Sequence, residues 1–287
     1  MIQYSLSGRI GSRISSGLVW FYLVVTFLPL FFMIETSIKP PRVGLGPFAA
    51  FKPTFKNYIE VWTGGKSSTC VDCASSVAFS RLLQHSIIIT FATVILTIAV
   101  ALPAAYGLTR NKFRSRKRIS NWVLSTYMFP AIVSIIPVYV IVSKFHMIDN
   151  PLALIIPYTA FNMPISVWIL RSSIFQIPAE IMEAAQVDGA KTWTELRQIV
   201  FPLIFPGIAT AGILAAILTW NEFLFALALT RSEYQTAPIG IQTFTGMFGT
   251  QWGSLTAAGM LIVTPMLIMT LILRRKIIAG LTFGAVK

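Results

Sequence analysis

The stretch Ile177–Pro206 reads IPAEIMEAAQVDGAKTWTELRQIVFPLIFP and lies between two strongly apolar segments. Pro178 suits the first position of a helix, because an N–H at that position has no intrahelical partner anyway. Glu180 follows in the first turn, where it faces the positive end of the helix dipole. Gly189 is a natural stop just past the helix, since glycine tolerates a left-handed backbone. The stretch is therefore expected to begin with a short helix that ends in a glycine turn.

A second helix is expected directly after this turn. Thr192 and Glu195 have the spacing of a capping box, which predicts a helix start. Four apolar residues then recur at the spacing of one helical face, namely Leu196, Ile199, Val200 and Leu203. Pro202 limits this helix. The local prediction is helix, glycine turn, helix, held at a membrane surface.

Composition places most of the chain in lipid. Hydrophobic residues make up 55% of the sequence and charged residues 11%, whereas a soluble domain has about 25% charged residues. The net charge of +13 is compatible with nucleic-acid binding. However, the cations gather in loops beside apolar spans, as in membrane proteins, and we find no motif for DNA or RNA. An integral membrane protein without a nucleic-acid partner is therefore expected.

Six apolar segments predict an all-α fold with six transmembrane helices. They cover approximately residues 17–37, 82–109, 119–143, 152–172, 203–229 and 254–273. The first is too long for a typical signal peptide and lacks a small-x-small cleavage site, so we interpret it as an uncleaved span. The third contains Pro130 and Pro137, and the fourth is expected to be broken by Pro157 and Pro164.

The orientation follows from one basic cluster. Residues 110–118 carry six positive charges in nine residues, which marks the cytoplasmic side and could also attract anionic lipid. The N-terminal residues 1–16, the loop 173–203 and the tail 277–287 are then cytoplasmic. The spans occupy 17–276, and the loop 38–81 is extracytoplasmic, although its six cations fit that side poorly.

The loop has a long spaced pattern that resembles a known family. Glu183-Ala184-Ala185, then Gly189, then Ile199 with Pro202 resembles the EAA loop of ABC-importer permeases of the type I fold. The family usually has Leu-Pro at the end, where this chain has Phe-Pro. The segments 219–226 and 280–287 resemble the second permease of maltose-type carbohydrate importers, as does the shorter piece 53–58. The resemblance covers most of residues 80–287.

This resemblance implies a cytoplasmic coupling helix that docks into a cleft of an ATPase subunit. The coupling positions carried over are Glu183, Ala184, Ala185, Asp188, Gly189, Ile199 and Pro202. Glu183 would be the charged contact, the two alanines the small docking surface, and Gly189 the turn. The implied partners are a second homologous permease, a dimer of ATPase subunits and an extracytoplasmic solute-binding protein that delivers a sugar or oligosaccharide. ATP and Mg²⁺ would bind the ATPase, and this chain would not hydrolyse ATP.

Trp220, Asn221 and Glu222 lie deep in the fifth span. An ionisable residue at the centre of a membrane helix costs about 2.5–3.5 kcal/mol on insertion scales. Glu222 should therefore face the bundle interior or a water-filled cavity. Two interpretations remain open here: the three residues line the solute pathway, or Glu222 makes a structural hydrogen bond to a neighbouring helix.

Two other classes of membrane protein are alternatives to a permease, and the ion-coupled transporter stays open. An ion-coupled secondary transporter needs several ionisable groups within the membrane or broken helices with ion sites. Here only Glu222 lies clearly in mid-span, and Glu35 lies near the end of a span. A membrane-embedded enzyme is disfavoured further, because the sequence has no HExxH motif and no paired intramembrane aspartates.

Cys70 and Cys73 form a C-x-x-C pair in the loop placed outside the cell. Disulfides persist in that compartment, so a structural bridge is expected. A redox role is the alternative, but no thioredoxin-like pattern surrounds the pair. The two histidines, His85 and His146, lie far apart in the sequence, and no metal site is predicted.

Overall fold

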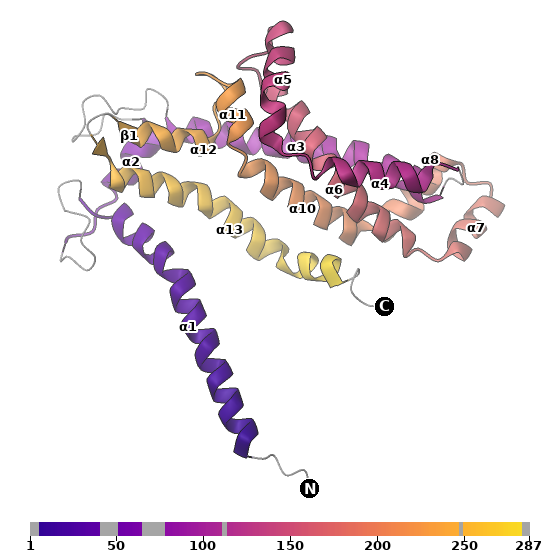
Figure 1. Ribbon diagram of the computed structural model, residues 1–287, viewed down its shortest axis with the longest axis horizontal. Coiled ribbons are helices and arrows are strands. Elements are labelled where there is room, and N and C mark those ends of the chain that lie inside the picture. The colour runs from indigo at the N-terminus through magenta and orange to yellow at the C-terminus, as the bar shows by residue number, and fades with distance from the viewer. Residues whose placement is uncertain (1–5, 41–50, 65–77, 111–113, 247–248, 283–287) are drawn as a thin grey trace. The chain divides into compact units, whose positions relative to one another are not determined.

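The computed structural model describes residues 6–40, 51–64, 78–110, 114–246 and 249–282, and most of them are helical (Figure 1). The chain divides into two compact units. The first comprises Met1–Ser80 and Ile241–Val263, and the second comprises Arg81–Gly240 and Thr264–Lys287. Cys70 and Cys73 lie outside the described residues, so the predicted disulfide stays a prediction.

The first unit contains one long helix and several short elements. These are α1 (Leu6–Ser37), α2 (Lys56–Thr63), the 3₁₀-helix η2 (Ile241–Phe244), β1 (Thr245–Gly246), β2 (Gly249–Thr250) and the beginning of α13 (Trp252–Thr282). The two strands pair antiparallel, with Thr245 opposite Thr250. The helix α13 continues from this unit into the second.

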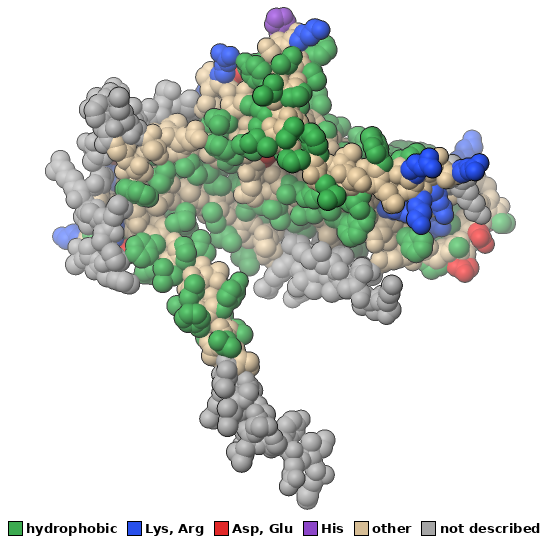
Figure 2. All heavy atoms as spheres, viewed as in Figure 1, with side chains coloured by type: hydrophobic (Ala, Val, Ile, Leu, Met, Phe, Trp, Pro, Cys, Tyr) green, Lys and Arg blue, Asp and Glu red, His purple; other side chains and the backbone are tan. Residues whose placement is uncertain are grey.

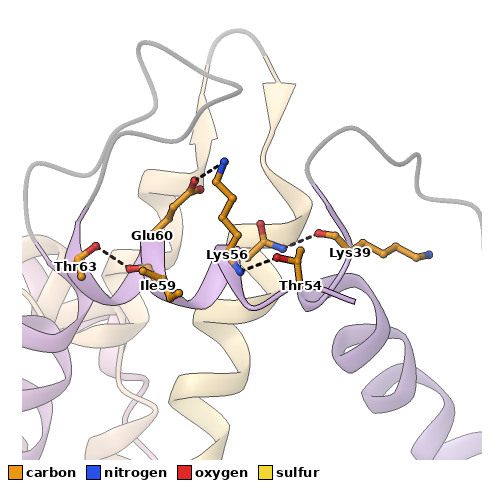
Figure 3. Close-up of polar contacts among 7 residues, drawn as sticks. Lys39, Thr54, Lys56, Ile59, Glu60 and Thr63 are labelled. Atoms are coloured by element: carbon orange, nitrogen blue, oxygen red, sulfur yellow. Dashed lines mark hydrogen bonds and ion pairs between the residues drawn. The ribbon is translucent and has the colours of Figure 1, made fainter. Parts of the chain in front are cut away.

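The end of α1 is fastened to α2 by polar contacts. The Asn57 amide donates to the carbonyl oxygens of Ser37 and Lys39, both at 2.8 Å. Lys56 pairs with Glu60 at 3.7 Å, and its backbone N–H donates to Thr54 (Figure 3). Asn57 is buried, so its two bonds satisfy the backbone where α1 stops. The segment 53–58, noted above for its resemblance, thus fixes this corner of the unit.

The second unit contains the remaining long helices. They are α3 (Phe79–Arg110, which begins in the first unit), α4 (Arg116–Thr126), α5 (Ala131–Lys144), α6 (Pro151–Phe175) and α10 (Phe205–Trp220). In the order of the chain, α10 is preceded by α7 (Ala179–Val187), α8 (Thr192–Thr194), the π-helix η1 (Glu195–Val200) and α9 (Phe201–Leu203), and it is followed by α11 (Leu224–Leu229) and α12 (Ala237–Gly240). The helices α4 and α10 both pack against α6 (Figure 1).

Among the described residues, four helices are long and apolar enough to cross a membrane, and up to six spans result if each of two bent pairs counts as one. The multi-pass membrane fold is therefore confirmed. Large apolar side chains remain exposed along α5, including Ile132, Ile136 and Ile141 (Figure 2). Exposed apolar surface of this extent suits a helix that faces lipid or another membrane chain.

The predicted third span is not one helix. It consists of α4 and α5, which meet at 91°. Pro130 precedes α5 in an extended conformation, and the residue before a proline is itself disfavoured in the helical region. The helix therefore stops at this point and restarts in a new direction.

The predicted break in the fourth span is wrong. The helix α6 runs through Pro157 and Pro164 without interruption. A proline frees one carbonyl in the preceding turn, and within a packed membrane bundle the neighbouring groups compensate for that loss. Most of the side chains around the two prolines are buried, so packing holds the helix together.

Candidate functional site

The first helix of the loop, α7, presents one face to the protein and the other outward. Its buried residues are Met182 and Ala185, whereas Glu183 and Ala184 are exposed. Ala185, expected on the docking surface, therefore packs on the chain's own core. Val187 is 87% exposed, which is unusual for an apolar side chain unless another protein or lipid covers it. The helix offers an exposed carboxylate and a small side chain to its surroundings.

The turn after α7 has the predicted glycine geometry. Gly189 has a φ of 80°, in the left-handed region that side chains disfavour. Its N–H bonds to the carbonyl of Gln186, and the N–H of Ala190 bonds to the carbonyl of Ala185. These two bonds are the Schellman pattern at a helix C-terminus. The expected glycine stop is confirmed.

The capping box predicted for the second segment is wrong. This segment runs through α8 (Thr192–Thr194), the π-helix η1 (Glu195–Val200) and α9 (Phe201–Leu203). Lys191 occupies the cap position and no side chain caps the helix. Because the helix starts one residue earlier than expected, Thr192 lies inside the first turn. Glu195 is only 3% exposed and makes no cap hydrogen bond.

The π-helix also changes the apolar face. Leu196 and Val200 are buried as predicted, but Leu203 is 51% exposed. A π-turn takes more residues per turn than an α-helix, so the later positions rotate away from the core. The segment ends at Leu203, one residue after Pro202, and the following α10 leaves at 80°.

A shared apolar cluster attaches this coupling loop (residues 173–203) to the long helices. Met182, Leu196 and Val200 pack in the same cluster as residues of α6 and α3, including Leu170 and Leu108. Lys and Arg side chains gather at the end of the unit where α4 begins, and the acidic side chains of α7 lie at the same end (Figure 2). The position of the loop therefore depends on the helices that carry it.

A cavity of about 810 Å³ lies between α4, α6 and the region where α10 ends. Aromatic rings form much of its wall, namely Trp122, Tyr127, Phe129, Tyr158, Phe161 and Phe225. Hydrogen-bonding groups are interspersed among them, namely Ser125, Thr126, Asn162, Thr219 and Glu222. Cavities with apolar walls and a few placed polar groups are typical binding sites for small molecules.

Glu222 lies where the predicted fifth span is interrupted. The helix α10 ends at Trp220 and α11 begins at Leu224, so a continuous helix over 203–229 is wrong. The Glu222 carboxylate accepts from the Tyr158 hydroxyl at 2.6 Å and from the backbone N–H groups of Phe225 and Ala226. It thereby satisfies two donors in the first turn of α11, which a helix start leaves open.

Of the three residues predicted for the solute pathway, only Glu222 lines this cavity. Trp220 is buried beside a separate, mainly apolar hollow between α3, α10 and α13. Asn221 is exposed and donates to the carbonyl of Ile217. The residues that sequence reasoning missed include Tyr158 and Asn162. Asn162, a polar residue within a span, was a usable signal, because such residues are rare in lipid-facing positions.

Asn162 connects two elements of the cavity wall. Its amide donates to the Thr219 hydroxyl at 3.1 Å and to the carbonyl of Tyr158 at 2.8 Å. It is 4% exposed, and buried polar groups are stable only when they are hydrogen-bonded. These contacts hold α6 and α10 in a fixed register beside the cavity.

The loop after α5 is tied to the loop after α11 by one carboxylate. Asp149 accepts the backbone N–H groups of Arg231, Ser232, Glu233 and Tyr234 at 3.0–3.2 Å. Burial raises the pKa of Asp149, but the four N–H donors lower it more, so the pKa falls from 3.8 to about 2.

Across the part of the chain that the structure describes, no three His, Cys, Asp or Glu residues cluster as metal ligands would.

Comparison with known proteins agrees with this architecture. The family model described as binding-protein-dependent transport system inner membrane component matches residues 97–281. The trehalose/maltose transport system permease protein MalG of Thermococcus litoralis is 33% identical over 267 residues, which are 92% of each chain. The diacetylchitobiose uptake system permease protein DasC of Streptomyces coelicolor is 29% identical over 290 residues, the whole length of both chains.

A solved structure shows the same fold. It is a chain of a bacterial ABC transporter involved in the import of the acidic polysaccharide alginate, with a TM-score of 0.77 and 21% sequence identity. The match covers 96% of this chain and 99% of that chain. Together with the family match over residues 97–281, it confirms the type I permease fold predicted from the coupling loop. The chain belongs to the family of binding-protein-dependent transport system inner membrane components.

Proposed function

We propose that this chain forms the membrane pathway of an ATP-driven importer for a sugar or oligosaccharide. The family is one of inner membrane transport components, so the chain is a transport subunit and ATP hydrolysis belongs to a separate subunit. The observation that carries the proposal is the exposed helix α7, closed by the left-handed Gly189 and bearing Glu183 and Ala184 outward. Such a helix suits insertion into a cleft of a partner.

The carbohydrate assignment is supported by two observations. Relatives over nearly the full chain are permeases for trehalose/maltose and diacetylchitobiose. The cavity beside Glu222 combines aromatic rings with hydroxyl, amide and carboxylate groups, and sugars bind by stacking on rings and by hydrogen bonds from their hydroxyls. Glu222 then lines the solute pathway and also supports α11.

The proposed assembly contains a second homologous permease, two ATPase subunits and an extracytoplasmic binding protein. Dependence on a binding protein is a property of the family. Within the chain, the span Ser15–Ser37 has none of its side chains buried in the most apolar window, so lipid or a second permease must cover it. ATP and Mg²⁺ bind the ATPase subunits, and both termini of this chain face the cytoplasm of a bacterial cell.

The Glu183 carboxylate would contact the ATPase through a charge-assisted hydrogen bond to a basic residue. The experiment reconstitutes the chain with its partner permease, ATPase and binding protein in proteoliposomes, and measures ATP-driven uptake of trehalose, maltose and diacetylchitobiose. We expect Glu183→Arg to abolish solute-stimulated ATP hydrolysis and uptake while the protein still inserts, because the side chain is exposed and outside the spans.

The ion-coupled alternative makes an opposite prediction in the same vesicles. Uptake that proceeds without the ATPase, and that an ionophore abolishes, would show a secondary transporter. Uptake driven by ATP but restricted to solutes other than carbohydrates would retain the importer and refute the sugar assignment.

A further inference from the structure

The solute cavity between α4, α6 and the region where α10 ends has a wall with very little charge. Among the described residues that line it, Glu222 is the one charged side chain. The other members of the wall are aromatic, aliphatic or hydroxyl-bearing side chains and the Asn162 amide. Arg and Lys, which proteins use to bind carboxylates, do not occur among these lining residues. The sign of the charge in the cavity therefore depends on the protonation state of Glu222.

The hydrogen bonds of Glu222 favour the ionised carboxylate. Its oxygens accept from the Tyr158 hydroxyl at 2.6 Å, from the Phe225 N–H at 3.0 and 3.2 Å and from the Ala226 N–H at 3.3 Å. These partners are all donors, and donors that bind the charged form of a carboxyl group favour that form. Because the donors are neutral, they stabilise the negative charge without cancelling it. The wall that this chain contributes is therefore negative.

Cationic side chains on the two helices that flank the cavity lie outside it. On α4, Arg118 lines a separate hollow at the beginning of the helix. On α6, Arg171 donates to the Ser120 hydroxyl. Neither arginine is among the residues that line the solute cavity. A charged group on a solute in this cavity would therefore meet the carboxylate of Glu222 and no cation of the described wall.

We propose that Glu222 selects solutes by charge, so that the pathway accepts neutral and amino sugars and excludes sugars that carry a carboxylate. This inference rests on the proposed function, since it assumes that the cavity holds the transported solute. Like charges repel more strongly between apolar walls than in water, because the effective dielectric constant is lower. The hydroxyl groups of a neutral sugar meet no such repulsion and can donate to the carboxylate. An ammonium group on the sugar would be attracted to it.

The test measures binding to the complex of permeases and ATPase without the solute-binding protein, because that protein makes its own selection. The neutral probes are trehalose, maltose and diacetylchitobiose. Each is compared with its uronate, in which one primary alcohol is replaced by a carboxylate, and with the amine that carries an amino group at the same carbon. Binding is followed to millimolar concentrations by tryptophan fluorescence, because Trp122 lies in the cavity wall and is 67% exposed. Trp122→Phe identifies the part of the signal that comes from the cavity.

Three variants separate the charge of the wall from its shape. Glu222→Gln removes the charge, whereas Tyr158→Phe removes a hydrogen bond to the carboxylate and keeps the charge. Glu233→Gln makes the same chemical change as Glu222→Gln at an exposed residue that does not line the cavity. Thermal stability is measured for each variant. The quantity compared is the ratio of affinities for the neutral and charged forms of one sugar, so that a general weakening of binding cancels.

We expect the wild-type complex to bind the uronate at least about tenfold more weakly than the neutral sugar, since juxtaposed like charges have a large effect on affinity. The amine should bind more tightly than the neutral sugar. In Glu222→Gln both ratios should move toward one. In Tyr158→Phe and Glu233→Gln they should stay near those of the wild type, because the carboxylate remains.

Three results would overturn selection by Glu222. They are equal binding of the neutral sugar and its uronate by the wild type, unchanged ratios in Glu222→Gln, or ratios lost equally in Glu222→Gln and Tyr158→Phe. If Glu222→Gln fails to fold, the order amine, neutral sugar, uronate must hold in both the wild type and Tyr158→Phe, since an effect of shape would not reverse with the sign of the charge. A wild-type complex that binds none of the probes would also overturn the inference. ATP-driven uptake by that same complex would leave the proposed importer standing.

Discussion

The two helical segments of the coupling loop are adjacent in sequence yet differ in environment. The helix α7 exposes Glu183, Ala184 and Val187 and buries little more than Met182 and Ala185. The second segment, from Thr192 to Leu203, buries a carboxylate, Glu195, together with Leu196 and Val200. One segment is therefore available to a partner, and the other is part of the chain's own core.

This difference shows how one loop can both present a surface to a partner and pack against the membrane helices. The exposed residues of α7 can be substituted with little effect on folding, because exposed positions contribute little to stability. Residues on the second segment connect to α3 and α6, so a change there is felt within the membrane helices. The glycine turn at Gly189 separates these two environments.

The largest expected effect comes from altering that turn. Gly189→Val should abolish solute-stimulated ATP hydrolysis and uptake, because a side chain at φ 80° costs about 1–2 kcal/mol and the strain is relieved by moving α7 against the second segment. No atom lies within 4 Å of a Cβ added there, so the effect is conformational and not a clash. The measurement is ATPase activity of the reconstituted complex with and without loaded binding protein.

Gly17→Val is the matched control for this change, since Gly17 also has open space around it and no left-handed φ. It should leave activity near that of the wild type. Wild-type stimulation in Gly189→Val would show that the turn does not orient α7, and the contrast between the two segments would lose its functional meaning.

An intermediate effect is expected at Glu222, whose carboxylate is half-buried, whereas Glu183 is exposed and Glu195 is buried. Glu222→Gln leaves one acceptor oxygen for three donors, and an unsatisfied buried donor costs about 1–3 kcal/mol. We expect uptake to fall several-fold with the ATPase still bound, and thermal stability to fall modestly.

Tyr158→Phe sharpens this test, because it removes the hydroxyl donor and leaves the two N–H groups of α11 satisfied. Lower uptake with unchanged stability in Tyr158→Phe would indicate a role in the solute pathway. Lower stability in both variants with normal uptake per folded complex would show that Glu222 only supports the helix start.

The smallest effect is expected at Asp149, which is exposed in part but fully engaged by backbone donors. Its pKa is about 2 in the folded chain against an ordinary 3.8, so its contribution to stability is present above pH 4 and is lost as the pH falls toward 2. Asp149→Asn should therefore lower the thermal midpoint by a few degrees at neutral pH, and the difference from wild type should shrink between pH 4 and pH 2.

Glu233→Gln is the control for this change, since only the backbone N–H of Glu233 binds Asp149. A difference that is absent at pH 7, or that grows on acidification, would contradict the role assigned to these four hydrogen bonds.

Part of this site was predictable from the sequence because it depends on local chemistry. Gly189 was identified from the conformational freedom of glycine, and its φ of 80° agrees with that prediction. By contrast, the capping box at Thr192 and Glu195 had the correct local pattern and the wrong outcome. Burial of Glu195 prevailed over a cap that contributes only about 1 kcal/mol.

The sequence by itself determined that this chain is an integral membrane protein, that the coupling loop contains a short helix ended by a glycine, and which family the chain belongs to. These properties follow from hydropathy, backbone freedom and spacing, which act within a few residues. Only the tertiary structure decided that α4 and α5 meet at a sharp angle, that α6 continues through two prolines, and that the Tyr158 hydroxyl donates a hydrogen bond to Glu222. Such outcomes depend on which distant residues come to lie together, because packing energies of several contacts outweigh the preferences of any single residue.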